Sequence, residues 1–183
     1  MARYNLGTLY QSKGQIDSAM VCYKESYGPQ HTKPYVNLGS IYHQRGQSDS
    51  AMMVSERALQ PGFESFEALI TIGRVHADRE EYGEAARTYT RFFAGYTGRD
   101  TTLMAAAKAE LAQAYGGLGV QAEQDGRLAD AIAYHRTAIK NQPDSAHHYY
   151  NLGNVHRQMS AWDEAVEAYA KGLDRDSVYV DAY

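Results

Sequence analysis

The sequence predicts an all-α fold in which one helix pair recurs about five times. Alanines recur 32, 34, 46 and 34 residues apart, and most are followed four positions later by an aromatic residue. Glycines recur at a second phase, inside the segments that precede these alanines. Hydrophobic residues make up 44% of the chain, which excludes a disordered protein. The alanines are Ala19, Ala51, Ala85, Ala131 and Ala165, and the mid-helix glycines are Gly7, Gly39, Gly73 and Gly153.

Each unit reads as two short helices joined by a tight turn. A glycine inside a helix costs about 1 kcal/mol relative to alanine, so its recurrence at one phase indicates the close approach of the facing helix. Gly14, Gly46 and Gly126 end three of the first helices, and Glu80 takes that place in the third unit. Pro34 begins a helix, and Pro61-Gly62 ends one. The predicted units are residues 1–31, 32–65, 66–104, 105–145 and 146–179.

The fourth unit departs from the common spacing. Leu111 and Leu118 begin two matches to the first-helix pattern, and they lie seven residues apart. Seven residues are about two helical turns, so we predict a first helix that is extended by two turns. The alternative is a helix broken at Gly116-Gly117. The irregular stretch at residues 94–100 is the expected hinge or bend of the array.

The chain lacks the polar capping unit with which repeat arrays normally end. Residues 176–183 resemble the lead-in to another first helix, and residues 180–183 would begin a further repeat. We therefore expect either a fragment of a longer array or an end that stacks on something else.

The composition excludes several classes of function. The net charge is −4, which gives no basic surface for nucleic acid. No apolar run reaches the roughly 20 residues that cross a bilayer. Cys22 is the single cysteine, which we expect to be buried, and a reducing, cytoplasmic compartment is the matching expectation.

The chain resembles the tetratricopeptide repeat family over nearly its whole length, through its 34-residue spacing and its Leu-Gly and alanine positions. The resemblance implies a right-handed solenoid whose first helices line a concave, peptide-binding groove. Carried over by phase, the groove residues are Tyr4, Asn5, Thr8, Asn37, Ser40, His43, Arg74, Gln113, Tyr150, Asn151, Asn154 and Arg157.

Asparagine recurs at one groove phase, as Asn5, Asn37 and Asn151. An asparagine amide can both donate to and accept from a peptide backbone. This row resembles the asparagine ladder in the repeat half of O-linked N-acetylglucosamine transferases, although Thr71 and Glu110 occupy that phase in the third and fourth units.

The chaperone-binding members of the family share a carboxylate clamp of lysine, asparagine and arginine that this chain does not match. At the clamp positions it has Tyr4, Thr8, Asn37, Glu67 and Thr71. Binding of a chaperone C-terminal carboxylate is therefore not expected.

No motif in the sequence indicates chemistry. There is no cysteine pair or HExxH helix for a metal, and Gly116-Gly117-Leu118-Gly119 lacks the preceding strand of a phosphate loop. His76 and His156 occupy a phase that holds tyrosine in other units, which indicates packing. We expect no catalytic residue and no cofactor within the chain.

Three hypotheses follow for function. The first is a non-catalytic scaffold that binds a segment of a protein or peptide partner in the groove. The second is the substrate-recruiting region of a larger enzyme, such as a glycosyltransferase. The third is an assembly scaffold that self-associates through its uncapped ends.

Overall fold

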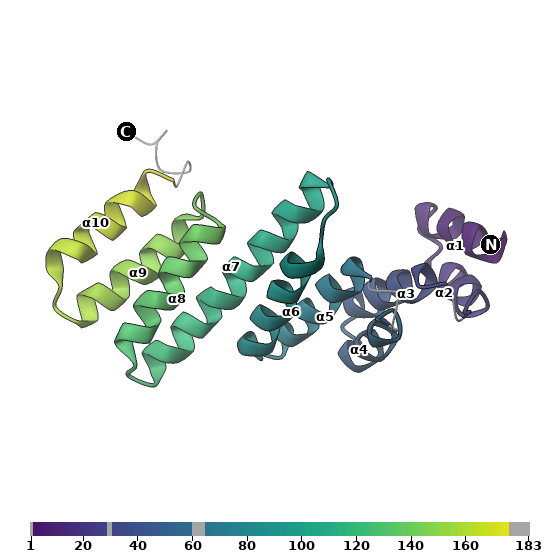
Figure 1. Cartoon of the computed structure of the whole chain (residues 1–183), viewed down its shortest axis with the longest axis horizontal. Coiled ribbons are helices and arrows are strands. Elements are labelled where there is room, and N and C mark those ends of the chain that lie inside the picture. The colour runs from purple at the N-terminus through teal and green to yellow at the C-terminus, as the bar shows by residue number, and fades with distance from the viewer. Residues whose placement is uncertain (1, 29–30, 60–64, 176–183) are drawn as a thin grey trace. The chain divides into compact units, whose positions relative to one another are not determined.

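Ten helices in five consecutive pairs make up the described part of the computed structural model (Figure 1). The structure describes residues 2–28, 31–59 and 65–175. The first helices of the pairs are α1 (Ala2–Ser12), α3 (Lys33–Gln44), α5 (Phe66–Asp78), α7 (Thr101–Gln124) and α9 (Ala146–Gln158). The second helices are α2 (Ile16–Lys24), α4 (Ser48–Arg57), α6 (Tyr82–Gly95), α8 (Leu128–Asn141) and α10 (Trp162–Leu173).

The all-α prediction is confirmed. Within the described ranges there is no β-strand, and the one element of that kind is an isolated bridge between Gly28 and His31. The predicted helix stop at Pro61-Gly62 and the further repeat at residues 180–183 lie outside the described residues.

The helices are divided between two compact units. The first unit comprises Met1–Arg79 and Arg91–Thr97, and the second comprises Glu80–Thr90 and Gly98–Tyr183. α6 therefore contributes its first part to the second unit and its last part to the first. The expected hinge at residues 94–100 includes the point where the chain passes from one unit to the other after Thr97.

In the first unit, small and aromatic residues pack the helices together. Ala19 and Tyr23 of α2 are fully buried beside Leu38 and Ile41 of α3. An aromatic cluster ends this unit, in which Phe92 packs edge-on against Phe66 and stacks on Tyr96. Cys22 is buried and carries a free thiol, as predicted. The core of the second unit includes Ala122, Ala131 and Val155 from three successive helices.

A glycine brings the two helices of a pair into contact. A Cβ on Gly7 would lie 2.7 Å from the ring of Tyr23, and one on Gly153 would lie 2.6 Å from the ring of Tyr169. No side chain fits in that space, which explains why glycine recurs at this phase despite its cost in a helix. Equivalent contacts join Gly39 to Ser55 and Gly119 to His135.

α7 is a single continuous helix. It runs through Gly116 and Gly117 without interruption, so the extended-helix prediction is confirmed and the broken-helix alternative is wrong. α7 already begins at Thr101, before residue 105, where the fourth repeat was predicted to start. Asp100 caps it, because the Asp100 carboxylate accepts from the backbone N–H groups of Thr102 and Leu103.

All five turns within the pairs contain a residue in the left-handed region. Gly14, Gly46 and Gly126 have φ values of 73°, 69° and 73°. In the other two turns the residue is not glycine, since Glu80 has φ 59° and Ser160 has φ 57°. A residue with a Cβ is strained in this region, so these two turns are less stable than the glycine turns.

Charged pairs link successive repeats at a fixed phase. Arg45, after α3, donates to Asp17 of α2 at 2.7 Å. Arg79, after α5, donates to Asp49 of α4 in the same way. The aspartates therefore lie in the first turns of second helices, as expected, and also pair with the following repeat.

Substitution of Gly153 by alanine should destabilise the second unit. The new Cβ would clash with the Tyr169 ring, and overpacking of this kind costs about 1–3 kcal/mol. Gly83→Ala is the matched control, because nothing lies within 4 Å of a Cβ there and alanine is the better helix former. Thermal melting followed by circular dichroism would show a lower midpoint for Gly153→Ala only. Equal midpoints would contradict the close approach.

Substitution of Ser160 by glycine should stabilise the turn between α9 and α10. Relief of the left-handed strain should contribute about 0.5–1 kcal/mol after the entropic cost of glycine. The control is Ser18→Gly inside α2, which should lower the melting midpoint because glycine is a poor helix former. A fall in the midpoint for Ser160→Gly would contradict this account.

Candidate functional site

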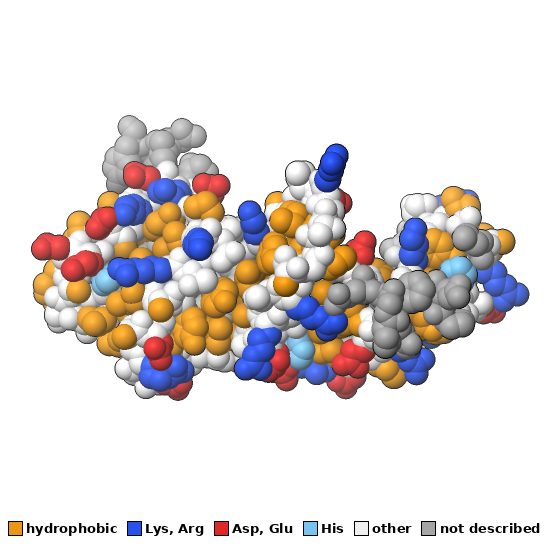
Figure 2. Space-filling model, in the orientation of Figure 1, with side chains coloured by type: hydrophobic (Ala, Val, Ile, Leu, Met, Phe, Trp, Pro, Cys, Tyr) orange, Lys and Arg blue, Asp and Glu red, His pale blue; other side chains and the backbone are white. Residues whose placement is uncertain are grey.

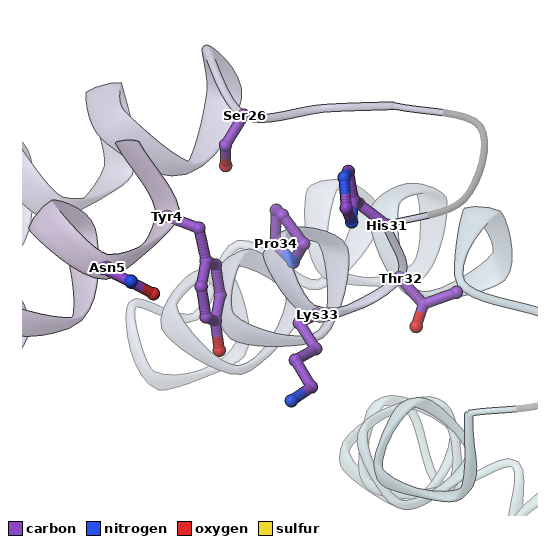
Figure 3. Close-up of a pocket in the computed structure, with 7 residues that line it drawn as sticks. All are labelled: Tyr4, Asn5, Ser26, His31, Thr32, Lys33 and Pro34. Atoms are coloured by element: carbon purple, nitrogen blue, oxygen red, sulfur yellow. The ribbon is translucent and has the colours of Figure 1, made fainter. Parts of the chain in front are cut away.

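In the first unit, Tyr4 of α1 lines two hollows, together with Thr32 and Lys33. Figure 3 shows Tyr4 projecting from α1 toward the start of α3, where Lys33 and Pro34 lie. One hollow has a volume of about 270 Å³ and the other about 370 Å³. The first is lined by Tyr4, Asn5, Ser26, His31, Thr32, Lys33 and Pro34, and the second by Tyr4, Thr32, Lys33, Val36, Asn37, Ser65 and Glu67.

Three predicted groove residues, Tyr4, Asn5 and Asn37, line these hollows. Asn37 is half-buried, and its amide donates to the Tyr4 hydroxyl over a long distance of 3.5 Å. A bond of that length is weak, so the amide hydrogen that Asn37 directs to Tyr4 is available to a stronger acceptor, while the hydrogen bond of Asn37 with Tyr23 holds the side chain in place. Asn5 is exposed.

Tyr23 supports the wall behind Tyr4. Its ring centroid lies 5.7 Å from that of Tyr4, and its hydroxyl donates to Gln11 at 2.6 Å. Burial raises the pKa of Tyr23, while a hydrogen bond with Asn37 opposes the rise. The Tyr23 hydroxyl therefore remains a neutral donor, and its contacts hold Tyr4 and Asn37 in place.

Among the other predicted residues of the first unit, His43 and Thr8 have hydrogen-bond partners within the protein. His43 Nε2 lies 2.9 Å from Asp78 Oδ2, which links α3 to α5. The Thr8 hydroxyl donates to the backbone carbonyl of Asn5 at 2.8 Å. Ser40 and Arg74 are half-buried on α3 and α5. These side chains lie outside both hollows.

In the second unit, two predicted residues of α9, Asn154 and Tyr150, contact α10. Asn154 accepts a hydrogen bond from the Tyr169 hydroxyl at 2.8 Å. The ring of Tyr150 covers Gly172, because a Cβ there would lie 2.9 Å from it. Asn151 is 3.2 Å from His147 Nε2 on the same helix, and Arg157 is exposed.

In the fourth repeat, the residue that contacts the second helix lies seven positions after the one that the first match in α7 predicts. Gly119 contacts the second helix through His135, sixteen residues later, which is the spacing of Gly7 from Tyr23. The first match in α7, which gave Gln113 as a groove residue, lies two turns before this contact. Gln113 is exposed on α7, and the residue at the asparagine phase is Gly117, which lies against Tyr82. The sixteen-residue spacing was the signal that identifies Gly119.

Sequence reasoning missed a groove of about 450 Å³ between α8 and α10. Tyr149 lies in it, with the Arg175 guanidinium 4.6 Å above the Tyr149 ring. Arg175 also donates to the backbone carbonyl of Pro143 at 2.8 Å. No repeat spacing in the sequence pairs Arg175 with Tyr149, because their contact depends on tertiary packing. The lining residues are Arg136, Ile139, Tyr149, Leu152, His156, Glu164, Glu167, Ala168, Lys171 and Arg175.

The described residues contain no group of metal ligands, and the face seen in Figure 2 has no large patch of one charge. Among the described residues, no three histidine, cysteine, aspartate or glutamate side chains are grouped so that they could hold a metal ion. On the face seen in Figure 2, basic and acidic side chains are interspersed with hydrophobic ones. No described helix is both long enough and apolar enough to cross a membrane.

Two of the three buried histidines of the second unit, His135 and His148, have shifted pKa values. His135 Nε2 is 2.8 Å from Glu123 Oε1, and a carboxylate only accepts, so Nε2 carries the proton of the neutral ring. His148 packs against Gly116, with its Nε2 3.4 Å from Gln142. Burial lowers the pKa of His148 to about 4. Burial also lowers the pKa of His135, against the opposing effect of Glu123.

Comparison with known families agrees with the geometry. A family model described as tetratricopeptide repeat matches residues 117–179, and a second with the same description matches residues 2–28 and 32–60. These matches together cover more than half of the chain. The chain belongs to the tetratricopeptide repeat family, whose stacked helix pairs serve as protein-interaction scaffolds.

Several solved structures share the fold. A crystal structure of MamA is 22% identical, covers 96% of each chain and has a TM-score of 0.70. A MamA RS-1 double mutant is 19% identical with a TM-score of 0.68, covering 98% of this chain and 95% of the other. MamA 41-end from Desulfovibrio magneticus RS-1 is 20% identical with a TM-score of 0.65, covering 96% and 93%. No curated protein matches the sequence.

The stability of the second unit should fall as the pH drops from about 6.5 to 4. An unfolded histidine takes up a proton near pH 6.5, whereas folded His148 stays neutral until about pH 4. The contribution of neutral His148 to the free energy of unfolding is complete above pH 6.5. Up to about 3 kcal/mol of it is lost as the pH falls toward 4. His148→Gln should show a shallower fall in melting midpoint between pH 7 and pH 4.5, while the exposed control His31→Gln in the first unit should follow the parent. Parallel profiles for all three proteins would contradict this assignment.

Proposed function

We propose that the chain is a scaffold that binds an extended segment of a partner protein along the first-helix side of its first unit. The two hollows beside Tyr4 support this proposal. Each holds roughly one large side chain, since drug-sized sites start near 300 Å³. Two small hollows that share one wall suit an extended chain, which places successive side chains in separate pockets.

The lining of the hollows supports recognition of a peptide backbone. Asn37 and Asn5 offer amide groups that donate and accept, and Thr32 adds a hydroxyl group. The weak bond between Asn37 and Tyr4 can be exchanged for a bond to a partner at little cost. Recognition through backbone groups makes few demands on the sequence of the partner.

The charge of Lys33 determines which residue is preferred in the bound segment. Lys33 lines both hollows, is exposed, and makes no ion pair with a described residue. The carboxylate of Glu67, by contrast, already accepts from the Ser65 hydroxyl at 3.1 Å. A segment with an acidic residue opposite Lys33 is therefore favoured.

Binding to an array of unstructured synthetic peptides tests this function. The tightest peptide is then titrated against the parent and against Asn37→Ala. Loss of one hydrogen bond of about 0.5–1.5 kcal/mol should raise Kd by about 3- to 10-fold. Asn141→Ala is the matched control, because Asn141 is a half-buried asparagine of the second unit that bonds to the Thr137 carbonyl.

Lys33→Glu provides a second arm of the same experiment. Lys33→Glu should weaken the binding of acidic peptides and leave the binding of neutral peptides unchanged, because it changes only the charge of a side chain that lines both hollows. Circular dichroism confirms that each variant is folded. An unchanged Kd for both Asn37→Ala and Lys33→Glu would exclude the hollows as the binding site.

A further inference from the structure

The groove between α8 and α10 exposes an apolar residue that is covered in an earlier repeat. Leu152 of α9 lines this groove and is half-buried. Leu38 of α3 holds the same position in its repeat, is fully buried, and belongs to one cluster with Val54 of α4. Ala168 holds the position of Val54 on α10. The smaller side chain of Ala168 therefore leaves Leu152 open to the groove.

A following repeat would not use this groove. In the first pair, Ile16 and Met20 of α2 pack in the cluster that joins α2 to α3. Trp162 and Val166 hold the same two positions in α10, and neither lines the groove. Glu167, which does line it, points about 100° away from Val166 around the helix. The surface on which a further repeat would pack is therefore separate from the groove.

Two charges of opposite sign on the groove have no partner among the described residues. Glu167 and Lys171 of α10 pair with each other. Arg175 already contacts an aromatic ring and a backbone carbonyl. Arg136 of α8 and Glu164 of α10 are exposed on opposite sides of the groove, and neither forms an ion pair within the described ranges. A ligand with an acidic group toward α8 and a basic group toward α10 is complementary to both.

The lining favours a helix over an extended chain. An extended segment needs partners for its backbone N–H and C=O groups, which asparagine and threonine supply in the hollows beside Tyr4. The described residues that line the groove include no asparagine, glutamine, serine or threonine. A helix satisfies its own backbone groups, so it requires only apolar contact and paired charges. Ile139, Leu152 and Ala168 offer that apolar contact.

We propose that the groove between α8 and α10 binds an amphipathic helix of a partner protein. The apolar side chains of that helix cover Ile139 and Leu152. A carboxylate on one edge of its apolar face pairs with Arg136, and a basic group on the other edge pairs with Glu164. Because these two charges differ in sign, they select one of the two directions in which the helix can lie. The groove thus takes a partner of different chemistry from the hollows beside Tyr4.

Two synthetic alanine-rich helices serve as probes. The mixed-charge peptide carries two leucines four residues apart, with glutamate on one edge of that face and lysine on the other. The basic peptide is identical except that lysine replaces the glutamate. Titration by fluorescence anisotropy should show that the parent prefers the mixed-charge peptide. Arg136→Glu should raise the Kd of the mixed-charge peptide by about 3- to 10-fold and lower that of the basic peptide.

A substitution on α10 tests the apolar part of the site. Ala168→Val places on α10 the residue that α4 has at this position, which should cover Leu152 and weaken both peptides by roughly 10-fold. Lys140→Glu is the matched control for Arg136→Glu, because Lys140 is also exposed on α8 and does not line the groove. It should bind both peptides as the parent does. Circular dichroism verifies that each variant is folded.

A mixed-charge peptide with a central proline provides the contrary test, because proline breaks the helix and keeps the other side chains. Binding of this peptide as tight as that of the helical one would overturn the proposal in favour of an extended ligand. Equal Kd values for the parent and Arg136→Glu with both helical peptides would also overturn it. So would a parent that dimerises in sedimentation equilibrium and an Arg136→Glu variant that does not, since a second copy would then occupy the groove.

The groove and the hollows beside Tyr4 share no residue. Asn37→Ala should bind the mixed-charge helix as the parent does, whereas Ala168→Val should bind the unstructured peptides as the parent does. Each proposal can therefore fail while the other stands.

Discussion

The contact of a glycine with a side chain of the facing helix determines the geometry of each repeat. In the first pair, Gly7 lies against the Tyr23 ring, and in the last pair Gly153 lies against Tyr169. The close approach lets the aromatic hydroxyl reach past the crossing to a polar residue on the first helix, as Tyr23 does to Gln11. One short contact thus fixes both the distance between the helices and their rotation.

The same contact explains which parts of the fold could be predicted from the sequence. The recurrence of glycine and alanine reflects a steric requirement within about thirty residues, so the sequence alone indicates the helix pairs and their order. The continuity of α7 could also be predicted, because seven added residues preserve the helical phase. Leu-Gly matches alone do not choose the phase of its contact, because Ala112 and Gly119 both fit, and it is the sixteen-residue spacing from Gly119 to His135 that distinguishes them.

The candidate site was less predictable for a physical reason. The position of a residue within the repeat places it on one face of its helix, but the partner that its side chain contacts depends on the neighbouring repeats. Asn37 and Asn154 both hold groove positions, yet Asn37 lines a hollow while Asn154 accepts from Tyr169. The groove between α8 and α10 was missed because its apolar floor includes Tyr149, whose Arg175 partner lies far along the chain. The fold itself serves many functions, so the partner must be identified from such local chemistry.

The two additional turns of α7 bear on how this chain can vary in length. The first part of α7 lies beside α6, where Glu110 meets Tyr89, and its last part meets α8 through Gly119. Seven residues rotate a helix by almost two full turns, so both parts keep the correct face toward their neighbours. An insertion of two or five residues would turn one of these faces to solvent. Length changes within a first helix are therefore restricted to steps near the helical repeat.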